Sequence, residues 1–583
     1  MFEAYRKLRS LLGPKERRGF YIILVGVLIN AVLETVGVGV ILPFISIVDE
    51  PAKLADYPFI VGVLDFLGAH TDRNRILTIG GAILGLMIFK NGFFYLFTRF
   101  QLSYIYNNSV VYSIKLLDSY LEADYLFHLQ TNSAVLMRNL KQEVPLLFSR
   151  VLLPLSAMIT ELTIAFFISL LLIYTAPVAT ITGAVLIGGI AVVFYRAIRK
   201  KARIYGQARL EHEAETYKWL NQSLNGIKEA KLFGARKFLV NQTESHYQQL
   251  AKIIVYEYLT GQMPRIFLEV LMAGGLILVV ILLTLQGMPS GEILPTLALF
   301  GAAAFRLMPA ANRSMGNLLT LKLAGPSLDN VYNSFEELKS VQIDQATLEA
   351  EHRPLAYEQQ IEIDQVSFYF PGAEAPALDQ LSFKIPKNQS VGIMGPSGSG
   401  KSTFLNLLLG LLLPSQGCIR ADGVDVGQNL KAWRQMIGFV PQEIYLTDDV
   451  IARNVAYGLP DEEIDRDRVW EALEMAQLKE LVTSMPEGLD SYVGERGVRL
   501  SGGQRQRIGI ARALYHNPEI LVFDEATSAL DTETEKEITK SIEALAHKKT
   551  IIIVAHRLST IENCDVVYRL DHGRLKTHDL KGN

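Results

Sequence analysis

Long apolar runs constrain this chain more than any other feature of its sequence. Between Arg18 and Asp49 the only charged residue is Glu34. At ~1.5 Å per residue, such a run makes a helix longer than the ~30 Å hydrocarbon core of a bilayer. No small-residue cleavage site follows it, which argues against a cleavable signal peptide. Similar runs predict six membrane spans, at about residues 20–47, 76–98, 151–174, 177–196, 264–286 and 292–312.

Basic residues near the spans indicate how the chain crosses the membrane. Lys and Arg are frequent before the first span, which exits into Asp49 and Glu50, and they follow the fourth span at Arg196–Arg203. Because Lys and Arg accumulate in cytoplasmic loops, we expect both termini to be cytoplasmic. The whole chain carries 57 Lys+Arg against 60 Asp+Glu, so no chain-wide basic surface offers itself to nucleic acid.

The composition changes after the last span. We assign residues 1–325 to a transmembrane domain, 326–359 to a polar connector and 360–583 to a second domain. Within the second domain, strand-like runs such as Ser390–Met394 alternate with helical stretches, which is typical of α/β folds. We therefore predict a multi-domain protein, with an all-α six-helix transmembrane domain followed by an α/β nucleotide-binding domain. The two cysteines, Cys418 and Cys564, provide no disulfide framework.

A glycine-rich segment, GPSGSGKST at residues 395–403, follows an apolar strand and opens into a helix-like stretch. This context is typical of a phosphate-binding loop, in which backbone N–H groups and a helix N-terminus face the phosphates. The predicted ligands are ATP and Mg²⁺, with Lys401 reaching the β- and γ-phosphates and Ser402 ligating the metal. The nucleotide-binding residues predicted here are Gly395, Ser397, Gly398, Ser399, Gly400, Lys401, Ser402 and Thr403.

A second apolar strand, residues 520–523, ends in Asp524 and Glu525. A Mg²⁺-bound nucleotide requires a carboxylate at such a strand end, and attack by water requires a base. We predict that Asp524 ligates Mg²⁺ and that Glu525 is the catalytic base.

The run LSGGQRQRIGIARAL at residues 500–514 resembles the signature of ATP-binding-cassette (ABC) proteins. Segments resembling the Q-loop, D-loop and H-loop of that family occur at Gln442, residues 528–531 and His556. The resemblance implies that Gln442 ligates Mg²⁺ and that Gln442 and His556 assist hydrolysis. It further implies that the signature contacts ATP held by a second subunit through Ser501, Gly502, Gly503 and Gln504.

Adenine should stack on an aromatic residue near the start of the second domain. The family pattern places Phe370 in this position, with the neighbouring Tyr369 as the alternative. The remaining interpretation is that Phe370 is an aromatic residue of the strand core and does not contact adenine.

Six spans and one cassette on one chain resemble a type I ABC exporter half-transporter, which implies a dimer, with an identical chain as the expected partner. In exporters of this type, coupling helices lie in the inner segments, here at residues 125–130 and 224–230.

Charges within or beside the spans are candidates for substrate contacts, because burying a charge in lipid is costly. The candidates are Lys90, Arg265, Arg306 and Arg313. Doubled in a dimer, these cations would suit a pyrophosphate. The alternatives are an Arg265–Glu269 pair, an Arg306 pair with Glu34 or Glu161, and headgroup positions for Lys90 and Arg313.

The apolar stretch between Asp56 and Asp65 is too short to span a membrane and predicts a short external helix. It either contacts a lipid tail or caps the other subunit.

Residues 264–269, 305–313 and 557–561 resemble the bacterial lipid-linked oligosaccharide flippase of N-glycosylation. This resemblance implies flipping of a polyprenyl-pyrophosphate-linked oligosaccharide to the outer leaflet of the bacterial inner membrane. The alternatives are a multidrug or lipid exporter and, disfavoured by the spans, a non-transporting ATPase.

Overall fold

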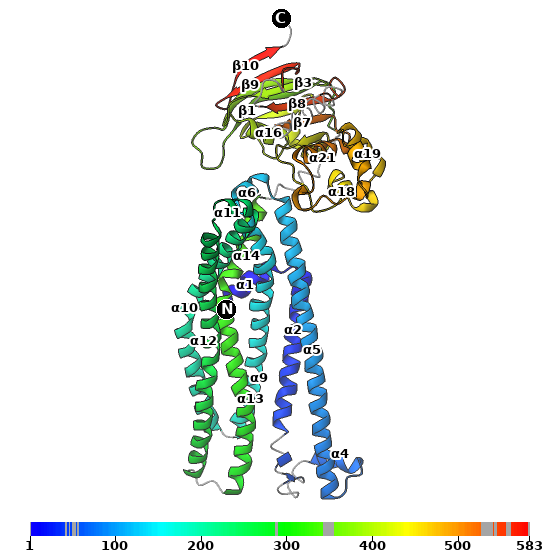
Figure 1. Ribbon diagram of the computed structural model, residues 1–583. Coiled ribbons are helices and arrows are strands. Elements are labelled where there is room, and N and C mark those ends of the chain that lie inside the picture. Colours follow the sequence, from blue (N-terminus) through cyan, green and yellow to red (C-terminus); the bar gives the residue numbers. More distant parts are fainter. Residues whose placement is uncertain are drawn as a thin grey trace. The chain divides into compact units, whose positions relative to one another are not determined.

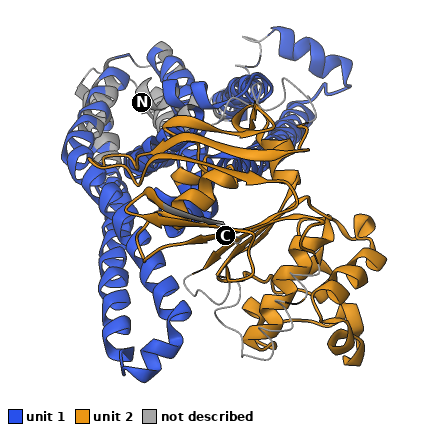
Figure 2. Cartoon of the chain, turned by 90° about the horizontal axis from the view of Figure 1, so that it is seen from above, with its two compact units in different colours: residues 1–123, 128–341 blue, residues 124–127, 342–583 orange. Residues whose placement is uncertain are grey.

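The computed structural model separates the chain into two compact units, residues 1–123 with 128–341 and residues 124–127 with 342–583 (Figure 2). We describe each unit by itself. The structure describes residues 2–580 except 41–43, 46, 49–53, 55–57, 176, 286–289, 342–354, 526–539, 541–544 and 556–560.

The first unit is helical (Figure 1). Its long helices are α2 (Pro14–Gly39), α5 (Asp72–Glu122), α9 (Leu153–Thr175), α10 (Pro177–Asn225), α12 (Arg236–Leu285) and α13 (Ser290–Leu323). Each contains one of the apolar runs found in the sequence. By length and composition, three helical stretches among the described residues could cross a membrane, namely 14–37, 72–122 and 133–170.

Shorter helices precede, connect or follow these long ones. They are α1 (Phe2–Leu11), α4 (Pro58–Phe66), α6 (Tyr125–Gln130), α7 (Ser133–Arg138), α8 (Val144–Leu146), α11 (Ile227–Leu232) and α14 (Gly325–Val341). Two π-helical turns, Asn139–Glu143 and Leu147–Leu152, adjoin α8. The expected connector at 326–359 thus begins as helix α14 of the first unit. Helices α6 and α11 overlap the two expected coupling segments, and residues 124–127, which include the start of α6, group with the second unit.

Helix packing in the first unit follows the apolar faces. Helix α2 packs against α5 and α9, and α13 packs against α9, α10 and α12. Between α2 and α9, Ala31, Ile164 and Ile168 are completely buried. By contrast, large apolar residues such as Leu84 and Phe89 on α5 are more than 60% exposed. Exposed apolar residues on a membrane span are typical of a face that contacts lipid or another protein chain.

Gly206 of α10 lies directly against the backbone of Leu323 at the end of α13. A Cβ atom at this position would lie 2.3 Å from the backbone oxygen of Leu323. We expect Gly206→Ala to destabilise the protein by about 1–3 kcal/mol, because the backbone cannot yield as a side chain can. Gly316→Ala on α13 is the matched control, since a Cβ there meets no atom within 4 Å. Thermal unfolding of the purified variants measures the difference, and equal midpoints for the two would contradict this packing.

The second unit contains two sheets. An antiparallel sheet has the order β2-β1-β4-β5, and a mixed sheet has the order β10-β9-β3-β8-β7-β6. The strands are β1 (Gln360–Phe368), β2 (Leu378–Pro386), β3 (Ser390–Met394), β4 (Gln416–Ala421), β5 (Val424–Asp425), β6 (Ile437–Val440), β7 (Ile520–Asp524), β8 (Thr550–Ala555), β9 (Val566–Asp571) and β10 (Arg574–Leu580). Strands β9, β3, β8, β7 and β6 are parallel, whereas β10 is antiparallel to β9.

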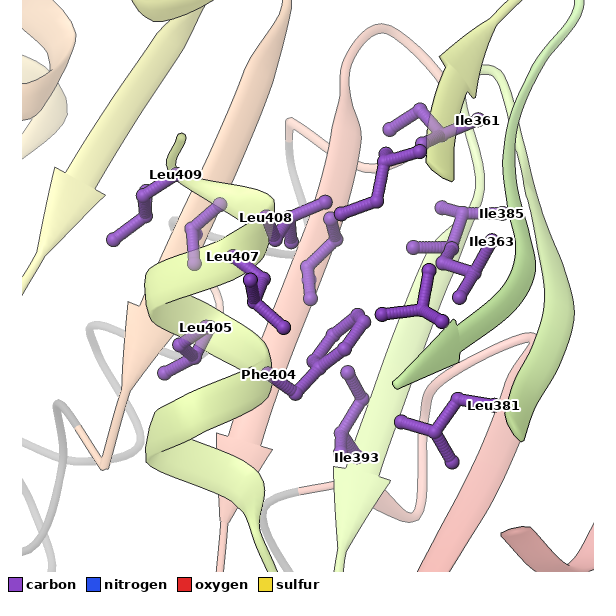
Figure 3. Close-up of a cluster of buried hydrophobic side chains, with 14 of the residues drawn as sticks. Ile361, Ile363, Leu381, Ile385, Ile393, Phe404, Leu405, Leu407, Leu408 and Leu409 are labelled. Atoms are coloured by element: carbon purple, nitrogen blue, oxygen red, sulfur yellow. The ribbon is translucent and has the colours of Figure 1, made fainter. Parts of the chain in front are cut away.

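Helix α16 (Lys401–Leu408) lies beside the strands that carry the larger core of this unit. Phe404, Leu407 and Leu408 project among residues of β1, β2 and β3, including Ile361 and Ile393 (Figure 3). Because α16 begins at Lys401, this packing fixes the start of the helix at the end of β3. Further helices in the described part of this unit are α17 (Leu430–Gln435), α18 (Ile451–Val455), α19 (Arg466–Met475), α20 (Lys479–Ser484) and α21 (Gly502–Tyr515).

Candidate nucleotide-binding site

The loop between β3 and α16 has the backbone of a phosphate cradle. Gly398 and Gly400 have φ angles of +79° and +99°, which side chains other than glycine rarely tolerate. A Cβ on Gly395 would lie 2.3 Å from the backbone oxygen of Leu570. The loop is therefore compact, and glycines are required where the chain turns and where another strand approaches.

Lys401 is held inside this loop. Its ammonium group donates to the carbonyl oxygens of Gly395 at 2.8 Å and Pro396 at 3.0 Å. Burial lowers the pKa of Lys401, and the nearby carboxylates of Glu525 and Asp524 oppose that shift. A cation held over a glycine-rich loop is positioned to neutralise phosphate oxygens. The buried hydroxyl of Ser399 has no partner within the described protein and is a further donor for such a ligand.

The two predicted acids lie at the same edge of the sheet as the loop. Asp524 of β7 is opposite Val554 of β8, and Val554 is opposite Ile393 of β3. Since these strands are parallel, their carboxyl ends meet beside Lys401. Glu525 follows with a φ of +47°, a left-handed conformation that costs about 1–3 kcal/mol for a residue other than glycine. Its backbone N–H donates to the oxygen of Val554, which holds the strained turn.

Gln442 joins this cluster from the end of β6. Strand β6 pairs with β7, and the Gln442 side-chain amide donates to Glu525 Oε2 at 2.9 Å. The structure therefore brings together Lys401, Gln442, Asp524 and Glu525, which the sequence separates by up to 124 positions. The amide oxygen of Gln442, the carboxylate of Asp524 and the hydroxyl of Ser402 are oxygen ligands of the kind that Mg²⁺ prefers.

The signature segment begins helix α21. Ser501 is the N-cap: its hydroxyl accepts from the Gln504 backbone N–H at 3.2 Å, and its own N–H donates to Gln504 Oε1 at 2.9 Å. This capping box fixes the first turn, and the hydroxyl can still donate its own hydrogen. Gly502 and Gly503 form the first turn of α21 with no side chain in front of their N–H groups. Such a helix start suits an anion.

Two aromatic residues follow β1. Phe370 packs edge-to-face on the buried Phe368, with ring centroids 5.0 Å apart. Tyr369 and Phe370 are 39% and 37% exposed, so both could stack on a base. The contact with Phe368 orients the Phe370 ring, which keeps it as our preferred adenine contact. His556 and residues 528–531 lie outside the described residues.

One hydrogen bond that braces the phosphate loop could not be predicted from any sequence motif. The N–H of Gly573, in the turn between β9 and β10, donates to the Ser399 oxygen at 3.1 Å. A Cβ on Gly573 would lie 2.6 Å from the Ala377 oxygen. The turn residues Asp571, His572 and Gly573 predict a turn, but nothing in them indicates what it contacts.

Three of the four candidate substrate cations have acidic neighbours in the helical unit. Lys90 Nζ lies 2.9 Å from Glu34, and its side chain is 13% exposed. Arg265 contacts Glu269 one turn later on the same helix, at 2.8 Å. Arg313 Nε lies 2.6 Å from Glu161 of α9. The alternative pairing of Arg306 with Glu34 or Glu161 involves a side chain that lies outside the described residues. Their pairing with Lys90 and Arg313 could not be read from spacing.

Comparisons with known proteins fit this arrangement. A model of the family "ABC transporter" matches residues 378–528. The ATP-dependent lipid A-core flippase of Cupriavidus metallidurans is 30% identical over 506 residues, which cover 86% of this chain and 82% of the relative. The chain belongs to the ABC transporter family.

Other matches to this ABC transporter are more local or concern the fold. The lipid A-core flippase of Cupriavidus pinatubonensis is 46% identical, but the match covers 37% of each chain. The structure of a bacterial Atm1-family ABC exporter with ATP bound superposes with a TM-score of 0.76 at 24% identity, covering 97% of this chain and 95% of the other. This likeness confirms the predicted fold class, a helical transmembrane domain followed by an α/β cassette.

Proposed function

We propose that this chain is half of a homodimeric transporter that uses ATP to move an anionic lipid from the cytoplasmic to the outer leaflet of the bacterial inner membrane. The observation that carries the proposal is the match to a lipid A-core flippase along both the helical unit and the cassette. This match favours a lipid exporter, which the sequence offered as an alternative, over the more specific oligosaccharide-lipid flippase.

Within the cassette, different residues bind the phosphates, bind the metal and accept the proton of the attacking water. Lys401 and the glycine N–H groups hold the phosphates, and Ser402, Gln442 and Asp524 would hold Mg²⁺, which supplies charge neutralisation when bound. Glu525 takes the proton of the attacking water. The hydrogen bond from Gln442 orients the Glu525 carboxylate and links the base to the end of β6.

The signature segment at residues 500–514 supports a dimeric transporter. Ser501 caps a helix whose first N–H groups are suited to an anion. The resemblance to the ABC signature implies that this anion is the γ-phosphate of ATP on the partner's phosphate loop. Each composite site would then contain Lys401 of one subunit and the signature of the other. Leu126 of α6 packs beside the cassette core, which fits a coupling role for this segment.

The substrate class rests on the relatives and on two features of the helical unit. Arg313 contacts Glu161 through Nε while its side chain is 49% exposed, and a guanidinium has further N–H donors that suit a phosphate. Helix α4 buries Leu64 but leaves Phe59 and Phe66 84% and 89% exposed. Exposed aromatic residues on a short helix beside a span suit contact with lipid tails.

A polyprenyl-pyrophosphate-linked oligosaccharide is the second candidate substrate. It is favoured by the segment at residues 305–313, which resembles the oligosaccharide-lipid flippase and contains Arg306 and Arg313. Lipid A-type and pyrophosphate-linked lipids share a phosphorylated headgroup and long apolar chains, so cations on the path would serve either.

Arg313 offers a direct test of an anionic substrate. We expect Arg313→Ala to raise the concentration of a phosphorylated lipid that half-stimulates ATPase activity by at least about tenfold, because a charge-assisted contact is lost. The response to a neutral lipid should not shift. Glu161→Gln is the matched control, since its amide oxygen can still accept from Arg313 Nε. Equal shifts for both lipid types would contradict the role of Arg313 in headgroup binding.

The proposed function as a whole is tested by lipid-stimulated ATPase activity in nanodiscs. Lipid A and a polyprenyl-pyrophosphate glycan should stimulate the wild-type protein, whereas neutral and cationic drugs should not. Stimulation by drugs alone would favour a multidrug exporter instead.

A further inference from the structure

Helices α10 and α12 contact each other through a series of paired ring-containing side chains, and we call each pair a rung. Tyr205 stacks on Tyr256 with ring centroids 4.3 Å apart, and Trp219 meets Phe238 edge-to-face at 5.7 Å. Between these rungs, His212 faces His246, with centroids 5.3 Å apart. The α10 members, at positions 205, 212 and 219, recur every seven residues. This spacing keeps side chains on one face of a helix.

The histidine rung differs from its neighbours because it brings two nitrogen atoms together. Nδ1 of His212 and Nδ1 of His246 lie 3.0 Å apart and form a hydrogen bond, in which one nitrogen carries the proton and the other accepts it. Two nitrogens bound to one tetrahedral metal ion at ~2.0–2.1 Å are separated by about 3.3 Å. To bind a metal, the hydrogen bond must open, the proton must move to the Nε2 of its ring, and both rings must rotate towards the ion, while the distance between the nitrogens changes little. The aromatic rungs on either side fix the helix spacing, and the pair is therefore preorganised.

We propose that His212 and His246 form a binding site for a divalent transition-metal ion of the imidazole-preferring class, Cu²⁺, Ni²⁺ or Zn²⁺, which cross-links α10 to α12. Among the described residues no cluster of three metal-binding side chains includes the pair, so water completes the coordination. Helix α10 runs to α11, and α12 runs back antiparallel beside α10 (Figure 1), so a bound ion would stiffen this hairpin. The site is separate from the cassette and does not depend on the proposed substrate.

The electrostatic setting suits a neutral, metal-binding imidazole. Burial lowers the pKa of His212, the neighbouring His246 lowers it further, and Glu211 acts in the opposite direction. Neutral imidazole retains the lone pair that a metal requires. Both residues lie outside the predicted spans, and both side chains are partly accessible to solvent.

The test uses the full-length protein without a polyhistidine tag and Cu²⁺ as the probe. Trp219 is one rung away, so bound Cu²⁺ should quench its fluorescence with a stoichiometry of about one ion per chain, and electron paramagnetic resonance should show two imidazole nitrogens. Zn²⁺ should compete for the same site only when present in large excess, because nitrogen ligands bind Cu²⁺ more tightly than Zn²⁺. Binding should weaken by at least about tenfold in His212→Ala and in His246→Ala, each of which loses one of two protein ligands. It should also weaken in acid, because a protonated imidazole has no lone pair for the metal.

His70→Ala is the matched control, because His70 is an exposed single histidine of the same unit whose removal should not alter quenching. His246→Gln replaces His246→Ala if the alanine variant does not fold, since glutamine keeps a polar side chain at the rung. Copper affinity unchanged in the His246 variants, or a resonance signal without two imidazole nitrogens, would overturn the proposal. A purely pH-dependent change without copper binding would overturn it as well.

Discussion

Replacing Glu525 with Gln is expected to reduce ATP turnover by at least about 10²-fold while ATP binding persists, because the attacking water loses its base. Glutamine keeps an oxygen that can accept the hydrogen bond from Gln442, and the sheet edge that carries Asp524 is unchanged. The variant should therefore accumulate with nucleotide bound. Single-turnover hydrolysis and equilibrium ATP binding, measured on the same preparation, check both parts of this expectation.

The control for this experiment is Asp524→Asn, which removes a metal-binding carboxylate and should weaken binding of Mg²⁺-ATP as well as turnover. A Glu525→Gln rate within about threefold of the wild-type rate would remove Glu525 from the role of base.

Ser501→Arg is expected to abolish hydrolysis in a homodimer, because its bulk and charge would occupy the anion-binding start of α21. The informative sample is a mixed dimer of one Ser501→Arg chain and one Lys401→Ala chain. If each composite site uses Lys401 of one chain and Ser501 of the other, one site carries both lesions and the second carries neither. The mixed dimer should then retain hydrolysis at its one unaltered site.

Two homodimers, each carrying one of the substitutions, provide the baseline for the mixed sample. Hydrolysis no faster in the mixed dimer than in either homodimer would show that phosphate loop and signature act within one chain. That result would contradict the head-to-tail arrangement.

The sequence predicted the cassette more completely than the helical unit. The phosphate loop, the Asp524–Glu525 strand end and the Ser501 signature are local patterns, and each sets its own backbone geometry. Parallel pairing of β3, β8 and β7 then brings Lys401 and the acids together, as an α/β fold requires. The brace from Gly573 to Ser399 was not predictable, because it depends on where one turn meets another.

In the helical unit, the apolar runs predicted the helices but not their partners. The pairs Lys90–Glu34 and Arg313–Glu161 join helices that are distant in sequence, and their register depends on packing. The histidine rung was missed for the same reason, since His212 and His246 are unremarkable until α10 and α12 are aligned. Helix α14 extends the helical unit into the expected connector, because its amphipathic residues can pack on the long helices.

The measurement that tests the central claim most directly is lipid translocation in proteoliposomes. Vesicles containing the protein and a labelled phosphorylated lipid are given ATP on the cassette side, and the fraction of lipid that reaches the opposite leaflet is followed over time. We predict ATP-dependent translocation by the wild-type protein and none by Glu525→Gln. Wild-type protein that hydrolyses ATP in these vesicles but leaves both lipid A and a polyprenyl-pyrophosphate glycan where they started would contradict the proposal of an anionic-lipid flippase.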